Sequence, residues 1–106
     1  MPKYLLSVSY TLPGIQGVQK EGGTARKNAA EKLIQSLGGT IESFYFAFGD
    51  DDVYLIADMP SNEAVAAASI RVAAAGGVVS KTTVLLTPEE IDRATHETSD
   101  YTPPGG

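Results

Sequence analysis

Residues 40–59 read TIESFYFAFGDDDVYLIADM, and this stretch decides the fold. Two runs rich in aromatic and aliphatic residues flank a glycine and three aspartates at 49–52. Aromatic and β-branched residues favour strands, whereas Gly and Asp favour the tight turn between two strands. The stretch therefore predicts a β-hairpin with strands over 40–48 and 53–59.

The predicted hairpin is apolar on both faces. A turn centred on Asp50-Asp51 places Phe48 opposite Val53, and the other pairs follow by alternation. One face then carries Phe44, Phe46, Phe48, Val53 and Leu55, and the other carries Ile41, Tyr45, Ala47, Tyr54 and Ile56. An antiparallel sheet with helices on one side normally shows polar residues on its other side. The second face of this sheet therefore needs a cover as well.

The rest of the chain alternates strands and helices around this hairpin. Before the hairpin, hydrophobic periodicity with Gly and Pro as boundaries predicts a strand over 3–10, a turn over 11–14, a helical turn over 15–21 and a helix over 24–37 capped by Thr24. After the hairpin, the same signals predict a helix from Ser61 to Ala75, a strand over 78–86 and a short helix capped by Thr87. This order, β-α-β-β-α-β and a terminal helix, predicts an α+β ferredoxin-like fold with both helices on one face of a four-stranded antiparallel sheet.

Composition limits both the domain count and the chemistry. A chain of 106 residues fits one domain, expected over 1–96 with a polar tail over 97–106. Eight basic and thirteen acidic residues give a net charge of −5, which argues against a nucleic-acid partner. There is no cysteine and one histidine, so disulfides, thiol nucleophiles and Cys- or multi-His metal sites are excluded. We expect no cofactor and no metal.

The second predicted helix suggests self-association. Between Ala64 and Ser80 the only charged residue is Arg71, and a helix that is apolar nearly all round is usually buried on more than one side. The stretch is too interrupted to span a membrane, and residues 1–10 lack a long signal-peptide core. We expect a cytoplasmic homo-oligomer whose open sheet faces pack together. The alternative is that the C-terminal helix and tail cover the open face of a monomer.

Two groups of residues are candidates for ligand binding. The Lys20-Glu21-Gly22-Gly23 run precedes a helix. Its backbone amides, together with the side chains of Lys20 and Arg26, could bind a carboxylate or a phosphate. Alternatively, the two glycines serve only to change the direction of the chain between two helices. Ser9, Tyr10 and Tyr45 are polar groups on apolar strands. They could orient a small aromatic or keto ligand, or bond one another or a neighbouring subunit.

The acidic turn is a further candidate. Asp50, Asp51 and Asp52 could bind a hard cation such as Mg²⁺ or Ca²⁺. The pattern lacks the distal glutamate of an EF-hand, and we favour a solvated turn.

The predicted ligand-binding set is Ser9, Tyr10, Lys20, Arg26, Tyr45 and Asp52.

Several short motifs resemble the GYD-domain family. They are Ser9-Tyr10-Thr11, Lys20-Glu21-Gly22-Gly23, Leu37-Gly38-Gly39, Phe44-Tyr45-Phe46-Ala47-Phe48-Gly49 and Leu86-Thr87-Pro88-Glu89-Glu90. The likeness covers about residues 3–93. It departs at the hairpin, where the family has Gly-Tyr-Asp and this chain has Gly49-Asp50-Asp51-Asp52. The resemblance implies no particular reaction. It does imply a fold similar to dimeric α/β-barrel proteins, which include cofactor-free oxygenases, isomerases and haem-degrading enzymes.

Three functions remain open at this point. The first is a homo-oligomeric module that binds a small anionic or aromatic molecule. The second is a cofactor-free oxygenase or isomerase that uses Tyr10, Lys20, Arg26 or Asp52 as acid, base or anchor. The third is a structural assembly protein, which predicts a dry, filled interface and no pocket.

Overall fold

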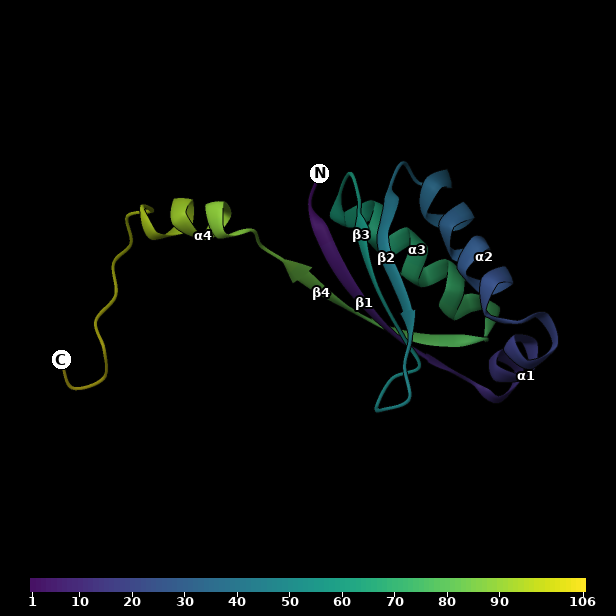
Figure 1. Cartoon of the computed structure of the whole chain (residues 1–106). Helices are drawn as coiled ribbons and strands as arrows, with labels where there is room; N and C mark the ends of the chain where they lie inside the picture. The colour runs from purple at the N-terminus through teal and green to yellow at the C-terminus, as the bar shows by residue number, and fades with distance from the viewer.

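The computed structural model describes all residues, 1–106, and contains four strands and four helices. In chain order they are β1 (Lys3–Tyr10), α1 (Leu12–Glu21), α2 (Gly23–Ser36), β2 (Thr40–Phe46), β3 (Val53–Asp58), α3 (Asn62–Ala75), β4 (Val78–Leu85) and α4 (Pro88–Thr95). The strands form one antiparallel sheet in the order β2-β3-β1-β4, and α2 and α3 cover the same face (Figure 1). The predicted α+β ferredoxin-like fold is confirmed.

The N-terminal boundaries of the first two helices differ from the prediction. The segment 11–14, expected as a turn, instead opens α1, because the Thr11 hydroxyl accepts a hydrogen bond from the Gly14 N–H at 3.3 Å. Pro13 lies in the first turn of this helix, where its missing N–H costs nothing. Helix α2 begins at Gly23 after Gly22, whose φ of 87° favours glycine, so Thr24 lies inside the helix and does not cap it.

The β2–β3 hairpin has the predicted strands but a different register. Phe46 pairs with Val53, so the pairing is shifted by two residues from the expected one. A shift of two residues keeps every side chain on its expected face. Phe48 lies beyond the strand and is fully exposed. A bulge between Ile41 and Ser43 reverses one expectation: Ile41 pairs with Ala57 and packs against the core.

The core lies between the helices and the sheet. Its nine buried hydrophobic residues are Tyr4, Leu6, Ile34, Val53, Leu55, Ala57, Met59, Val65 and Ala68. Met59, at the end of β3, is fully buried, and its N–H donates to the Pro2 carbonyl at 3.0 Å. Met59 therefore joins the start of β1 to the end of β3 beneath the helices.

The other face of the sheet carries no second layer. Tyr45, Tyr54 and Val79 are exposed there, with exposed fractions of 71%, 36% and 61%. At one end of this open face, the Lys3 ammonium bonds the carboxylates of Glu42 at 2.7 Å and Asp58 at 2.9 Å. No helix is both long enough and apolar enough to cross a bilayer.

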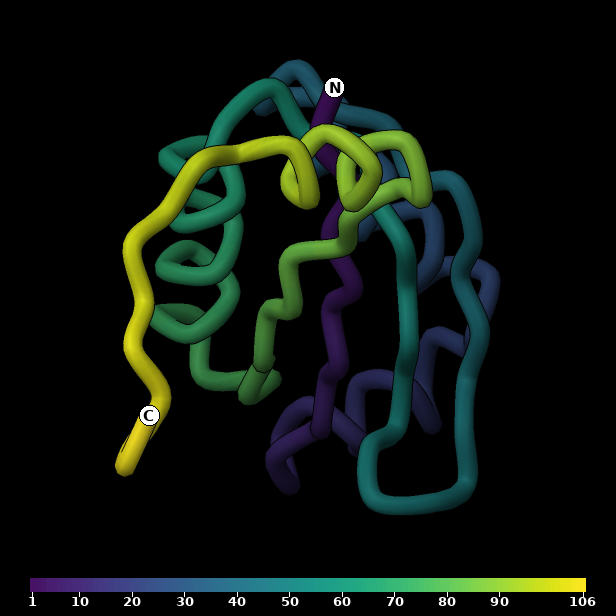
Figure 2. The backbone as a smooth tube through the Cα atoms, turned by 90° about the vertical axis from the view of Figure 1, so that its left-hand side faces the viewer, coloured from purple at the N-terminus to yellow at the C-terminus, as the bar shows by residue number.

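The C-terminal segment leaves the open face uncovered. Strand β4 carries α4 and the tail away from the rest of the molecule, so the alternative that this segment covers the sheet of its own chain is wrong (Figure 1). Figure 2, turned so that this segment faces the viewer, shows α4 crossing in front of one end of the sheet. The radius of gyration is 17.1 Å, whereas a compact chain of this length has about 13 Å.

Candidate functional site

A cavity of about 130 Å³ lies between the helices and the central strands. Helix α2 forms one wall of the cavity, with Ala29, Ala30, Leu33 and Ile34. Helix α3 forms the opposite wall, with Ala68, Ser69 and Val72. The sheet forms the floor, with Leu6, Val8, Phe44, Val53 and Leu55. Thirteen of the sixteen lining residues are hydrophobic. The cavity is therefore an apolar space with few polar groups, the usual character of a small-molecule site.

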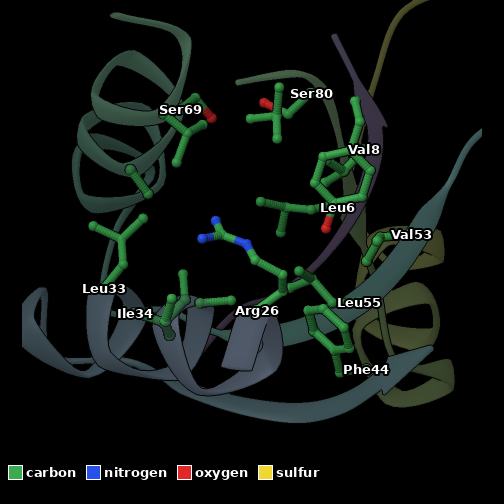
Figure 3. Close-up of a pocket in the computed structure, with 16 residues that line it drawn as sticks. Leu6, Val8, Arg26, Leu33, Ile34, Phe44, Val53, Leu55, Ser69 and Ser80 are labelled. Carbon is green, nitrogen blue, oxygen red and sulfur yellow. The ribbon is translucent and has the colours of Figure 1, made fainter. Parts of the chain in front are cut away.

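The Arg26 guanidinium is the one charged group in this cavity. Its side chain extends from α2 into the open space, toward Ser69 and Ser80 (Figure 3). One of its nitrogens, Nη1, lies 3.4 Å from Oε2 of Glu21, in an ion pair that leaves both side chains partly exposed. A guanidinium has five N–H donors. The contact with Glu21 therefore leaves donors for an anion in the cavity.

Tyr10 lines the same cavity from the end of β1. Burial raises the pKa of its phenol, although the nearby Arg26 charge acts in the opposite direction. The phenol is therefore protonated near neutral pH and can donate a hydrogen bond. Its backbone N–H donates to Oδ2 of Asp52 at 2.8 Å, and the Asp52 N–H donates to the Val8 carbonyl at 2.8 Å. Asp52 thus holds the end of β1 in place.

The structure separates the six predicted ligand-binding residues into several places. Tyr10 and Arg26 line the cavity, and Asp52 supports Tyr10 from behind. Lys20 is exposed on α1, outside the cavity lining. Ser9 and Tyr45 belong to the open face, because successive residues of a strand point to opposite sides of a sheet.

The run from Glu21 to Gly23 positions Arg26 at the start of α2. Glu21 holds the guanidinium, and Gly22 supplies the positive φ at which α1 ends and α2 begins. A Cβ on Gly23 would lie 2.9 Å from the ring of Phe46, so glycine lets α2 approach β2 closely. These residues together fix the position of the first turn of α2, from which Arg26 points.

Sequence reasoning missed Ser69 and Ser80. Ser69 carries the only side-chain hydroxyl in α3, a helix rich in alanine and valine, and this isolated hydroxyl was the available signal. Ser80 lies on β4 opposite Val8, on the helix-covered face. The two hydroxyls and the Tyr10 phenol give the cavity neutral hydrogen-bonding groups beside a single positive charge.

A second polar cluster lies on the open face around Asp51, which is only 6% exposed. Its carboxylate accepts hydrogen bonds from the Ser9 hydroxyl at 3.0 Å and the Tyr54 phenol at 3.3 Å, and lies 3.4 Å from the Lys81 ammonium. The bond from Ser9, with help from Lys81, lowers the pKa of Asp51, whereas burial and the Asp51 charge raise the pKa of Tyr54. No three acidic or histidine side chains come together in a way that could hold a metal ion.

The lowered pKa of Asp51 predicts a specific acid sensitivity. A carboxyl group with a lower pKa in the folded state stabilises the fold above its unfolded pKa, about 3.9, and this stabilisation disappears as pH falls through the folded value. We therefore expect Asp51→Asn to be less stable than the native chain at neutral pH, with a difference that shrinks as pH falls below about 4. Urea midpoints measured across this range test it. The exposed neighbour provides the control, Asp50→Asn, and a difference for Asp51→Asn that does not change with pH would contradict the prediction.

Comparison with known proteins identifies one family. A family model described as the GYD domain matches residues 4–95, from β1 to the end of α4. No curated protein and no solved structure matches the chain.

Proposed function

The chain belongs to the GYD-domain family, and we propose that it is a homo-oligomeric module that binds a small molecule in the cytoplasm. The observation that carries this proposal is the apolar cavity with a single guanidinium inside it. The guanidinium is partly exposed and lies beside Glu21 at the edge of the cavity. An anionic ligand inside the cavity would accept charge-assisted hydrogen bonds from its remaining donors.

The size and lining of the cavity point to a ligand class. An apolar cavity of roughly 150 Å³ can hold one benzene ring, and the volume here is about 130 Å³. A guanidinium binds carboxylates through paired hydrogen bonds. The best-fitting ligand is therefore an aromatic monocarboxylate with one ring, whose ring contacts Leu33 and Leu55 and whose carboxylate meets Arg26 and the Tyr10 phenol.

The lining favours binding over the two alternatives. An oxygenase or isomerase needs a general base beside the substrate, and Tyr10 and Arg26 are the titratable residues among the sixteen that line the cavity. Burial raises the pKa of the Tyr10 phenol, so this phenol acts as a hydrogen-bond donor near neutral pH, and a guanidinium has donors only. A purely structural protein would fill this space with side chains, because protein cores are close-packed.

The open sheet face supports the homo-oligomer. Tyr45, Tyr54 and Val79 are exposed on it, and aromatic side chains are enriched at protein–protein interfaces. A second copy would present the same surface, and a twofold contact between identical faces is the commonest arrangement in homo-oligomers. The lack of cysteine is consistent with a reducing compartment.

We expect Arg26→Gln to bind phenylacetate about 20-fold more weakly than the native chain, because a hydrogen bond to a charged group contributes about 1.5–3 kcal/mol. Phenylacetamide, which has the same shape but no charge, should bind both proteins equally. Titration followed by NMR chemical shifts of the backbone amides measures both affinities.

The control is Lys27→Gln, which removes the same charge from an exposed neighbour on α2 that does not line the cavity. Phenylacetate should bind this variant as it binds the native chain. Equal affinities for the carboxylate and the amide in the native protein, or equal losses in the two variants, would contradict the proposal.

A further inference from the structure

The C-terminal arm, residues 86–101, carries apolar side chains that the rest of its own chain leaves uncovered. Leu86, Ile91 and Tyr101 are exposed by 56%, 46% and 79%. The arm continues the line of β4 and lies on the side of the sheet that faces away from α2 and α3 (Figure 1). Because the family match runs to residue 95, α4 is part of the domain and not an appended tail.

Local structure fixes the direction of the arm. The connection from Leu85 to Pro88 contains no glycine, and Pro88 restricts the backbone at the first helical position. The Thr87 hydroxyl accepts from the Glu90 N–H at 3.1 Å, and the Glu90 carboxylate accepts from the Thr87 N–H at 3.0 Å. This capping box fixes where α4 begins. Because α4 lies away from the sheet of its own chain, its exposed apolar side chains are open to another molecule (Figure 1).

Helix α4 also needs such a cover. An isolated helix of eight residues is too short to be stable in water, because forming the first turn is costly. Leu86 and Ile91 occupy the positions of a hydrophobic staple, on either side of the capping box. The staple and the capping box favour the start of the helix, and burial of its apolar side against a partner would supply the remaining stabilisation.

We propose that the C-terminal arm of one copy packs on the open sheet face of a second copy, and that the second arm does the same in return. A second copy stacked on the open face lies on the side toward which the arm already projects (Figure 1). Its Tyr45 and Tyr54, which are paired across β2 and β3, offer exposed aromatic surface to Leu86 and Ile91.

The net charge of the arm disfavours contact between the arms of two copies. The arm carries Glu89, Glu90, Asp92, Glu97 and Asp100 against Arg93, a net charge of −4 with His96 neutral. Two such arms repel each other. The open face carries the Lys81 ammonium, whose side chain is 70% exposed and which is paired with Asp51. Exchange of arms therefore keeps the two acidic arms apart, and it rests on the proposed homo-oligomer but not on the proposed ligand.

Ile91→Asp tests the exchange in the full-length chain. We expect this variant to raise the dimer dissociation constant about tenfold or more, because it places a charge in the apolar contact. The matched control is Ile70→Asp, which changes an isoleucine on α3 that is 69% exposed and lies outside the arm and the open face. Sedimentation velocity over a concentration series measures both constants. Equal dissociation constants for the two variants would overturn the exchange.

Cross-linking locates the contact without weakening it. The chain has no cysteine, so Ile91→Cys gives a single attachment point for a benzophenone photo-cross-linker. Native-sequence protein labelled with ¹⁵N is mixed with the unlabelled variant, and cross-linked peptides are identified by mass. We expect unlabelled arm peptides joined to labelled peptides of β1–β4. A dimer whose cross-links lie within one copy would overturn the exchange alone, whereas a monomer at all concentrations would overturn the homo-oligomer as well.

Discussion

Gly39→Ala should lower the free energy of unfolding by about 3 kcal/mol, since overpacking a core costs roughly 1–3 kcal/mol or more. Gly39 is buried in the connection between α2 and β2. A Cβ at this position would lie 2.5 Å from the Asp58 carbonyl oxygen and 3.1 Å from Cγ2 of Ile34, and would overlap the sulfur of Met59. Met59 and Ile34 are themselves fully or almost fully buried, so neither can move aside freely. The strain would reach the strand end that joins β1 to β3.

The control is Gly17→Ala in α1, where an added Cβ meets nothing within 4 Å. Alanine is the better helix former, so we expect this variant to gain about 0.5 kcal/mol. Thermal unfolding should separate the two variants clearly, because 3 kcal/mol corresponds to roughly 15 °C in a domain of this size. Similar melting temperatures would mean that the α2–β2 connection can relax and that Gly39 is not packed as described.

The elements that local signals define could be predicted from the sequence. The Thr87-Pro88-Glu90 pattern places the start of α4 correctly, and Ser61 caps α3 as expected. The register of the β2–β3 hairpin could not be predicted in the same way. Its loop is held by bonds to a distant strand, including the Asp52 N–H to the Val8 carbonyl at 2.8 Å, and the bulge at Ile41 depends on packing against the core.

In the candidate site, too, single residues could be predicted from local signals, whereas their arrangement in space could not. Arg26 could be singled out because glycines precede it at a helix start, and Tyr10 because it is polar on an apolar strand. Their common cavity could not be predicted, because it depends on how α2 and α3 lie across the sheet. Ser9 looked equivalent to Tyr10 in the sequence, yet it bonds Asp51 on the open face. A one-residue step along a strand separates the two sites, so residue type alone does not assign either of them.

Ser69→Phe should abolish binding of an aromatic carboxylate, with a loss of roughly 100-fold or more. Ser69 projects from α3 toward the cavity, opposite Arg26 (Figure 3). A cavity of about 130 Å³ has room for one aromatic ring, and the phenylalanine ring would occupy it. The ligand would lose the apolar contacts that fully bury its ring, even though Arg26 remains in place. Calorimetric titration with phenylacetate measures the loss.

This variant separates the cavity from the charge as the source of affinity. Because the new ring fills empty apolar space, the variant should melt no lower than the native chain. Ala67→Phe is the matched control, since it adds a ring to the exposed side of the same helix, outside the cavity, and should leave binding unchanged. If Ser69→Phe bound phenylacetate as tightly as the native chain, Arg26 would be acting from the protein surface and the ligand would lie elsewhere. If both variants lost binding equally, a distorted α3 rather than a filled cavity would explain the loss, and the melting temperatures would show it.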